Sequence, residues 1–263
     1  MHFESARAQA SVGVQGGRLA PLIIDGLEVL VTEGPKPTRW GSFPMIPWYG
    51  RLPHGVMEFG GQRWAFPLNS PPHANHGLSF LQVWSVAEPG LIRADLLDPW
   101  PFGGHVTQRF ELDDNSLTLT LTLTATVHGS DRAMPAMIGW HPWFRRELDR
   151  GQTALLSFEA ESVYLVDDEA IPTGELVAVP PAPWDHCFVG LSADPVITWP
   201  NALGAHPLEL TVSSDMDHWV IFTEPEQALC IEPQSGPPNE FHIAPQVVRP
   251  GETMTHYMRL AWA

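Results

Sequence analysis

Cysteine is scarce in this chain of 263 residues, which contains only Cys187 and Cys230. Two widely separated cysteines cannot form the dense disulfide framework of a small secreted domain. Neither belongs to a Cys-x-x-Cys or mixed Cys/His pattern of the kind that binds structural zinc. A chain of this length can bury enough apolar surface to fold without a crosslink. We therefore expect both cysteines to be small buried hydrophobic residues.

Basic residues are also few, because 14 lysines and arginines stand against 30 acidic residues and give a formal net charge of −16. Such a field repels a phosphate backbone, and no basic stripe in the sequence compensates for it. The composition therefore predicts no nucleic-acid partner and no anionic membrane surface. It also favours, more weakly, a neutral or cationic ligand over a polyphosphorylated one.

Long apolar runs are absent, since no stretch approaches the roughly 18 residues of a membrane-spanning helix. The best apolar stretch near the N-terminus, residues 21–31, is interrupted by Asp25 and Glu28. The N-terminus also lacks the basic segment and uninterrupted apolar core of a signal peptide. The sequence therefore predicts a soluble, cytoplasmic protein.

Helical periodicity is hard to find, whereas alternation with a period of two recurs. From Leu117 to Thr124, leucine and threonine alternate four times, as a half-buried antiparallel strand requires. Weaker alternation predicts strands at 155–160, 208–213, 219–223, 228–232 and 253–261. The 27 prolines fall mostly between these runs, where a missing N–H does no harm. With no linker or repeat, the pattern predicts one all-β domain over residues 1–263, a sandwich or closed β architecture.

Five segments combine ionisable groups with glycine, proline or aromatic residues next to predicted strand ends, where scaffolds display functional groups in loops. They are residues 48–62, 73–77, 139–144, 184–188 and 231–239. Taken singly, each has an ordinary explanation. His76 fits a loop residue, His141 a hydrogen-bonded core histidine and Glu232 a solvated strand end. Arg51 fits a surface charge and Asp185 a turn residue.

A metal site is an alternative explanation for the histidines. His73, His76 and Glu232 are ligand types found in His/carboxylate metal sites. In an extended segment, however, residues three apart point to opposite faces of the strand. We therefore expect no metal at these histidines.

Taken together and in this order, the segments resemble those of the aldose 1-epimerases, the galactose mutarotase family. The similarity is strongest in Asn75-His76-Gly77, in Gly139 to Phe144, and from Glu232-Pro233 through Pro237-Pro238. The segment around Asp185 is similar to the aspartate-centred sugar contact of the family. The chain departs from the family in one position, because Gly50 stands where an asparagine often precedes the arginine.

The resemblance implies a large antiparallel β-sandwich of the galactose mutarotase-like type that needs no cofactor. It also implies a small-molecule sugar as the partner, bound by a monomer or a homodimer. The residues that it implies are Glu232, His141 and His76 for catalysis and Arg51, Asp185, Asn75 and Trp143 for substrate binding.

Mutarotation needs one group to remove the proton of the anomeric hydroxyl and another to protonate the ring oxygen. A carboxylate and a protonated imidazole suit these tasks near neutral pH. We therefore expect Glu232 to act as the base and His141 as the acid. His76 would donate a hydrogen bond where charge develops.

Three other functions fit parts of the sequence. A hexose-6-phosphate 1-epimerase would use the same chemistry with added cations. The candidate cations are Arg145, Arg146, Arg39 and Arg63. A glycosidase would pair Glu232 with Asp185 across a cleft but leave the histidines without a role. A non-catalytic sugar-binding module would tolerate the loss of Glu232 and His141, yet the chain has both.

Overall fold

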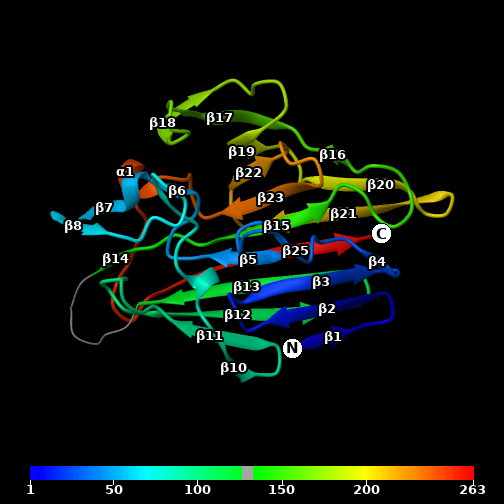
Figure 1. The fold of residues 1–263 in the computed structure, drawn as a ribbon, viewed down its shortest axis with the longest axis horizontal. Helices are drawn as coiled ribbons and strands as arrows, with labels where there is room; N and C mark the ends of the chain where they lie inside the picture. The colour runs from blue at the N-terminus through cyan, green and yellow to red at the C-terminus, as the bar shows by residue number, and fades with distance from the viewer. Residues whose placement is uncertain (126–132) are drawn as a thin grey trace.

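Two large antiparallel sheets make up most of the computed structural model, which describes residues 1–125 and 133–263 (Figure 1). In spatial order the 11-stranded sheet comprises β1 (His2–Glu4), β2 (Ala8–Gly13), β3 (Arg18–Ile24), β5 (Ser42–Met45), β15 (Gly139–Arg145), β23 (Ala228–Gln234), β22 (His218–Phe222), β19 (Asp185–Leu191), β17 (Ala160–Val166) and β18 (Pro172–Val177), with β4 (Leu27–Glu28) beside β3. The eight-stranded sheet comprises β10 (Ser85–Glu88), β11 (Leu91–Asp95), β12 (His105–Leu112), β13 (Ser116–Thr124), β25 (Thr253–Trp262), β21 (His206–Ser214), β20 (Val196–Leu203) and β16 (Leu155–Ser157).

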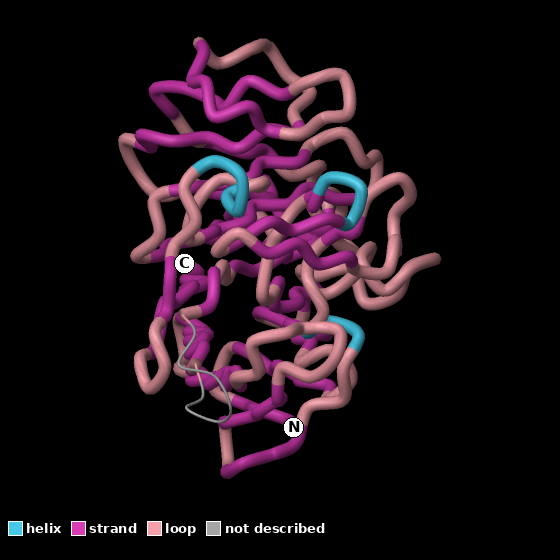
Figure 2. Tube along the Cα trace, turned by 90° about the vertical axis from the view of Figure 1, so that its left-hand side faces the viewer, coloured by secondary structure: helices cyan, strands magenta, loops and turns pink. Residues whose placement is uncertain are grey.

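Short pieces of structure complete the described chain. They are the pairs β6 (Arg51–Leu52) with β9 (Ala74–Asn75), β7 (Val56–Phe59) with β8 (Gln62–Ala65) and β14 (Met134–Pro135) with β24 (Val247–Val248), the helix α1 (Glu240–Ile243), and 3-10 turns at Pro53–Gly55 and Ser79–Leu81. In Figure 1, β6, β7, β8, β14 and α1 gather at one end of the long strands. Figure 2 shows how little helix there is, and no helix in the described residues is long and apolar enough to span a membrane.

Five of the six strands that the alternation predicts correspond to strands of the structure. The Leu-Thr run forms β13, in the middle of the eight-stranded sheet, and the predicted strands at 208–213, 219–223, 228–232 and 253–261 fall in β21, β22, β23 and β25. The antiparallel β-sandwich is thereby confirmed. One strand prediction is wrong, because the run at 155–160 is divided between two sheets. Its first half is β16, and Ala160 begins β17 in the other sheet.

The core lies where the two sheets face each other. The four leucines of β13 are fully buried while its threonines remain half-exposed, as the alternation predicts. Eight of the 11 tryptophans are buried. Both free cysteines are buried as well, which confirms the expectation for them. Burial of each large apolar side chain stabilises the fold by roughly 1.5–3 kcal/mol.

One polar side chain connects the two sheets within this core. Gln108 of β12 is fully buried, and its Nε2 donates to the carbonyl of Gly17 at 2.8 Å. Its Oε1 accepts from the indole N–H of Trp140 in β15, also at 2.8 Å. A buried polar group is stable only when such partners are present. Gln108 therefore helps fix how β15 sits over the eight-stranded sheet.

We predict that Gln108→Leu lowers the free energy of unfolding by about 2–5 kcal/mol, because it leaves two buried groups without partners. Urea unfolding followed by tryptophan fluorescence measures the change. Gln152→Leu, at an exposed position, is the matched control and should shift the free energy by less than about 0.5 kcal/mol. Equal stability of the two variants would contradict the role of Gln108.

Candidate active site

The floor of the candidate site is formed by adjacent strands of the 11-stranded sheet. In the antiparallel pairing of β15 with β23, Gly139 lies opposite Gln234 and Trp143 opposite Cys230. The same register places His141 across from Glu232, midway between these two pairs. Alternate residues of a strand share a face. His141 and Trp143 of β15 therefore point to the same side of the sheet as Cys230 and Glu232 of β23.

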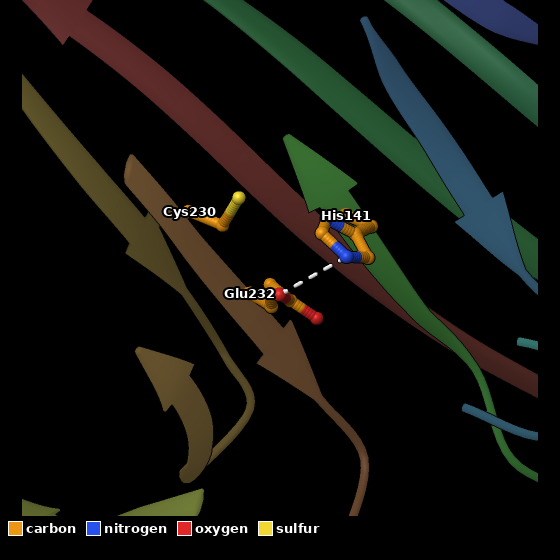
Figure 3. Close-up of side chains that lie close together, drawn as sticks. All are labelled: His141, Cys230 and Glu232. Carbon is orange, nitrogen blue, oxygen red and sulfur yellow. Dashed lines mark ion pairs between the residues drawn. The ribbon is translucent and has the colours of Figure 1, made fainter. Parts of the chain in front are cut away.

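His141 and Glu232 form the closest ionisable pair of this floor. The Nε2 atom of His141 lies 3.3 Å from the Oε1 atom of Glu232 (Figure 3). The two side chains are only 5% and 3% exposed. The second carboxylate oxygen accepts a long hydrogen bond from Gln234 Nε2, at 3.4 Å. The imidazole and the carboxylate are thus close enough to share one proton.

Aromatic rings hold the imidazole of His141 in place. The ring of Trp143 is nearly parallel to it, with centroids 5.1 Å apart and planes inclined by 8°. Phe43 of β5 also stacks on it at 5.1 Å, and the ring of His76 meets it edge-on at 4.9 Å. These contacts restrict rotation of the imidazole, which keeps Nε2 directed at Glu232.

Burial opposes an isolated charge on either member of the pair. Loss of hydration raises the pKa of Glu232 well above its ordinary 4.5, and the nearby charge of Asp185 adds to the effect. Loss of hydration lowers the pKa of His141 well below 6.5, with further contributions from His76 and Arg39. The pair as a whole therefore favours one shared proton, a state without net charge.

His76 approaches the same site from a loop. It follows β9, has a positive φ of 60° and is held by a hydrogen bond of 3.0 Å from its backbone N–H to the carbonyl of Gly50. Gly77 also has a positive φ, and a Cβ there would collide with the backbone of Ile46. Desolvation and the charges of Arg51 and Arg39 lower the pKa of His76 to about 3. The imidazole is therefore neutral at ordinary pH, and a neutral imidazole can still donate one hydrogen bond from its ring N–H.

Arg51 and Asp185 form an ion pair across the pocket wall. The distance from Nη2 of Arg51 to Oδ2 of Asp185 is 3.1 Å, and Nη1 donates to the carbonyl of Ala170 at 3.3 Å. Both side chains are about one-third exposed. Asn75 pairs with Arg51 through β6 and β9, and its side-chain oxygen has no hydrogen-bond partner. These groups retain free donors and acceptors toward the pocket.

The tryptophans near the motifs divide between pocket and core. Trp143 lines the pocket, where it supports His141. Trp140 is on the opposite face of β15 and bonds to Gln108, so its ring belongs to the core between the sheets. Trp48 is also buried, and neither Trp48 nor Trp140 lines this pocket.

A single pocket of about 150 Å³ brings together all seven predicted site residues. They are Glu232, His141, His76, Arg51, Asp185, Asn75 and Trp143. His73 does not line it, and its Nδ1 instead accepts a hydrogen bond from the backbone N–H of His54. Lining residues outside the five sequence segments include Lys36, Thr38, Arg39 and Phe222, and Gln234 of the fifth segment also lines the pocket.

The expectation that functional groups lie in loops at strand ends is wrong for the central pair. His141 lies inside β15 and Glu232 inside β23, and both strands are buried on both faces. Asp185 begins β19, while His76 alone of the catalytic set lies in a loop. Strand positions fix a side chain more rigidly than loop positions do, because the backbone is held on two sides.

Gly50 has a packing reason to be glycine. Its φ is +59°, and a Cβ would lie 2.6 Å from the Cβ of Pro238. Any larger residue would push Pro238 away from the pocket, which both residues line. Gly50 and the proline segment that follows Glu232 are therefore matched to each other.

Metal-binding potential in the described residues centres on His141, Cys230 and Glu232 (Figure 3). Their ligand atoms all lie within 4.8 Å of one another. Zinc binds the thiolate form of cysteine, but burial raises the pKa of Cys230 well above 9 and so favours the thiol. The trio as it stands is a proton-transfer pair beside a thiol whose burial favours the neutral form.

Comparison with known proteins identifies the family. The family model for aldose 1-epimerase matches residues 2–261. The chain belongs to the aldose 1-epimerase family. It is similar to the uncharacterized protein YihR of Escherichia coli (strain K12), with 27% identity over 261 residues, 89% of this chain and 82% of the relative.

Solved structures share the fold of this aldose 1-epimerase family member. A galactose mutarotase-like protein from Clostridium acetobutylicum has a TM-score of 0.84 and 17% identity, covering 100% of this chain and 94% of that one. The GalM/aldose epimerase homologue from C. elegans has a TM-score of 0.80 and 17% identity, covering 100% and 98%. At such identities the likeness establishes the galactose mutarotase-like fold.

The two thiols of this aldose 1-epimerase family member offer a test of the site's packing. Burial raises the pKa of Cys187 and of Cys230, so neither forms the reactive thiolate readily. We predict that Ellman's reagent labels neither thiol of the native protein at pH 8 within minutes and labels both in 6 M guanidinium. Rapid labelling of Cys230 in the native state would mean that the floor of the pocket is open to solvent.

Proposed function

We propose that the protein is an aldose 1-epimerase that interconverts the α and β anomers of a hexose by acid–base ring opening and reclosure. The observation that carries this proposal is the 3.3 Å contact between His141 Nε2 and Glu232 Oε1 on the floor of a sugar-sized pocket. Family membership supports the same reaction.

Burial favours the shared proton on Glu232 in the free protein, so the proposed reaction requires that sugar binding shift this proton to His141 and free the carboxylate of Glu232 to act as a base. Glu232 removes the proton of the anomeric hydroxyl while His141 protonates the ring oxygen. The bond between C1 and the ring oxygen then breaks, which leaves an aldehyde at C1. After rotation about the C1–C2 bond the transfers run in reverse, and the ring closes on the other face.

The remaining groups position the sugar in this proposal. Neutral His76 donates a hydrogen bond to the ring oxygen or a neighbouring hydroxyl, which stabilises developing charge. Arg51 and Asp185 bind hydroxyls through the donors and acceptors that their own ion pair leaves unused. Asn75 adds the side-chain oxygen that has no partner in the protein.

The glycosidase alternative receives less support from the same geometry. The partner of Glu232 is His141, whereas Asp185 is paired with Arg51. A retaining or inverting glycosidase needs its two carboxyl groups to act on one bond. An arginine-bound Asp185 is better suited to hold hydroxyls than to serve as a nucleophile or base.

We predict that Glu232→Gln and His141→Asn each reduce kcat by about 10²–10⁴-fold, the range typical of a lost general acid or base. The rate is measured by polarimetry after dissolving crystalline α-D-glucose or α-D-galactose, on protein treated with EDTA. Glu224→Gln and His206→Asn, at exposed positions, are the matched controls and should keep full activity. Wild-type rates that fall with EDTA, or variants that remain active, would refute this mechanism.

The pH profile provides a second test. Only the one-proton form of the pair is active, and a second proton must add to an imidazole whose pKa is lowered well below 6.5. We therefore predict that the acid limb of the kcat/KM profile lies well below pH 6.5. The alkaline decline follows loss of the last proton, at a pH well above the ordinary 4.5 of a carboxyl group. An acid limb centred at or above pH 6.5 would show that burial does not lower the pKa of His141.

A further inference from the structure

The chain contains a single lysine, and that lysine lines the candidate active site. Lys36 is the only lysine among the 263 residues, which include 30 acidic side chains. Three of the 14 basic residues, Lys36, Arg39 and Arg51, line this one pocket.

The positive charges of the pocket exceed its negative charges. Asp185 is paired with Arg51, and the pair of Glu232 with His141 is neutral when it shares one proton. In the described part of the chain, neither Lys36 nor Arg39 has a carboxylate within ion-pair distance. The pocket therefore carries a local positive charge in a protein whose overall charge is −16.

Arg39 is directed into the pocket. Its guanidinium carbon lies 5.4 Å from the centre of the Trp143 ring and 5.9 Å from that of Phe222. Its charge also contributes to the lowered pKa values of His76 and His141. The proposed acid and this cation therefore both contact the indole ring of Trp143.

The turn that carries both cations is anchored before any ligand binds. It lies between β4 and β5, and the backbone N–H of Arg39 donates to the carbonyl of Lys36 at 3.0 Å. Buried Arg18 donates to the carbonyls of Pro37, at 2.5 Å, and of Trp40. Such anchoring lowers the entropy that ligand binding must remove.

The other candidate cations are engaged elsewhere. Arg145 binds Glu28 and the carbonyl of Leu30, and Arg146 binds the carbonyls of Pro225 and Thr223. Neither lines the pocket, and Arg63 lies exposed in β8, next to Glu58. Of the four arginines that the sequence offers for binding an anion, only Arg39 faces the site.

We propose that the preferred substrate is an aldose that carries an anionic group away from its anomeric carbon, and that Lys36 and Arg39 bind this group. The inference rests on the proposed epimerase function and specifies its substrate class. A phosphate, a sulfonate and a carboxylate share the chemistry that an ammonium and a guanidinium recognise. The proton transfers at C1 and the ring oxygen are unchanged.

Exchange NMR on equilibrated sugars tests the proposal. The panel contains D-glucose and three analogues with a phosphate, a sulfonate or a carboxylate at C6, each corrected for its spontaneous rate. We expect kcat/KM for at least one anionic sugar to exceed that for glucose by about tenfold or more, as one charge-assisted contact provides. Added NaCl should reduce this preference through screening, and the order among the three anions identifies the substituent.

The decisive variant is Lys36→Met/Arg39→Met, compared with Arg63→Met as the matched control. We expect the double substitution to lower the anionic-to-neutral ratio of kcat/KM at least tenfold, chiefly through KM, and the control to leave the ratio unchanged. A ratio near one in the wild type, or one that the double substitution does not alter, overturns this inference while the epimerase function stands. If no sugar in the panel is accelerated, the proposed function itself fails.

Discussion

The register of β15 against β23 is the constraint on which the site depends. It sets His141 across from Glu232 on one face of the sheet, and it sends Trp140 and Ile231 to the core on the other face. A shift by one residue would exchange these faces. The hydrogen bond from Trp140 to Gln108 resists such a shift, because a slipped strand would leave both groups buried and unpaired. Packing between the sheets and the chemistry of the pocket are therefore fixed by the same pairing.

Placing the pair inside two buried strands has an electrostatic consequence. Water cannot solvate a lone carboxylate or imidazolium there. The pKa of Glu232 is therefore raised and that of His141 lowered, so that each group favours its neutral form. A shared proton that rests on Glu232 avoids this penalty, because both groups are then uncharged. The low local dielectric also strengthens the effect of every nearby dipole and charge, which makes the positions of His76 and Arg39 matter for how readily the proton moves.

The sequence predicts five strands of the two sheets and names seven residues that the structure gathers in one pocket, for identifiable physical reasons. Alternating leucine and threonine describes a half-buried strand directly, so β13 follows from local pattern alone. The site residues follow instead from short motifs that resemble one family. Position within the fold does not follow from either, since a local pattern does not show which strands will be central and β15 contains a proline, a histidine and an arginine. That is why His141 and Glu232 were expected at loop ends and lie within strands.

Lys36 and Arg39 show where reasoning from sequence motifs ends. They belong to no motif, and more than 100 residues separate them from His141 along the chain. Their relation to the pocket exists only after β5 pairs with β15 and brings the preceding turn beside Trp143. The net charge of −16 argues, as a whole-chain quantity, for a neutral or cationic ligand. The electrostatic energy of a ligand in the pocket depends mainly on the nearest charges. Salt screens the interaction with exposed charges that lie farther away than about 8 Å at physiological ionic strength. The net charge therefore describes the protein surface as a whole, whereas the charges of Lys36 and Arg39 determine which ligands the pocket favours.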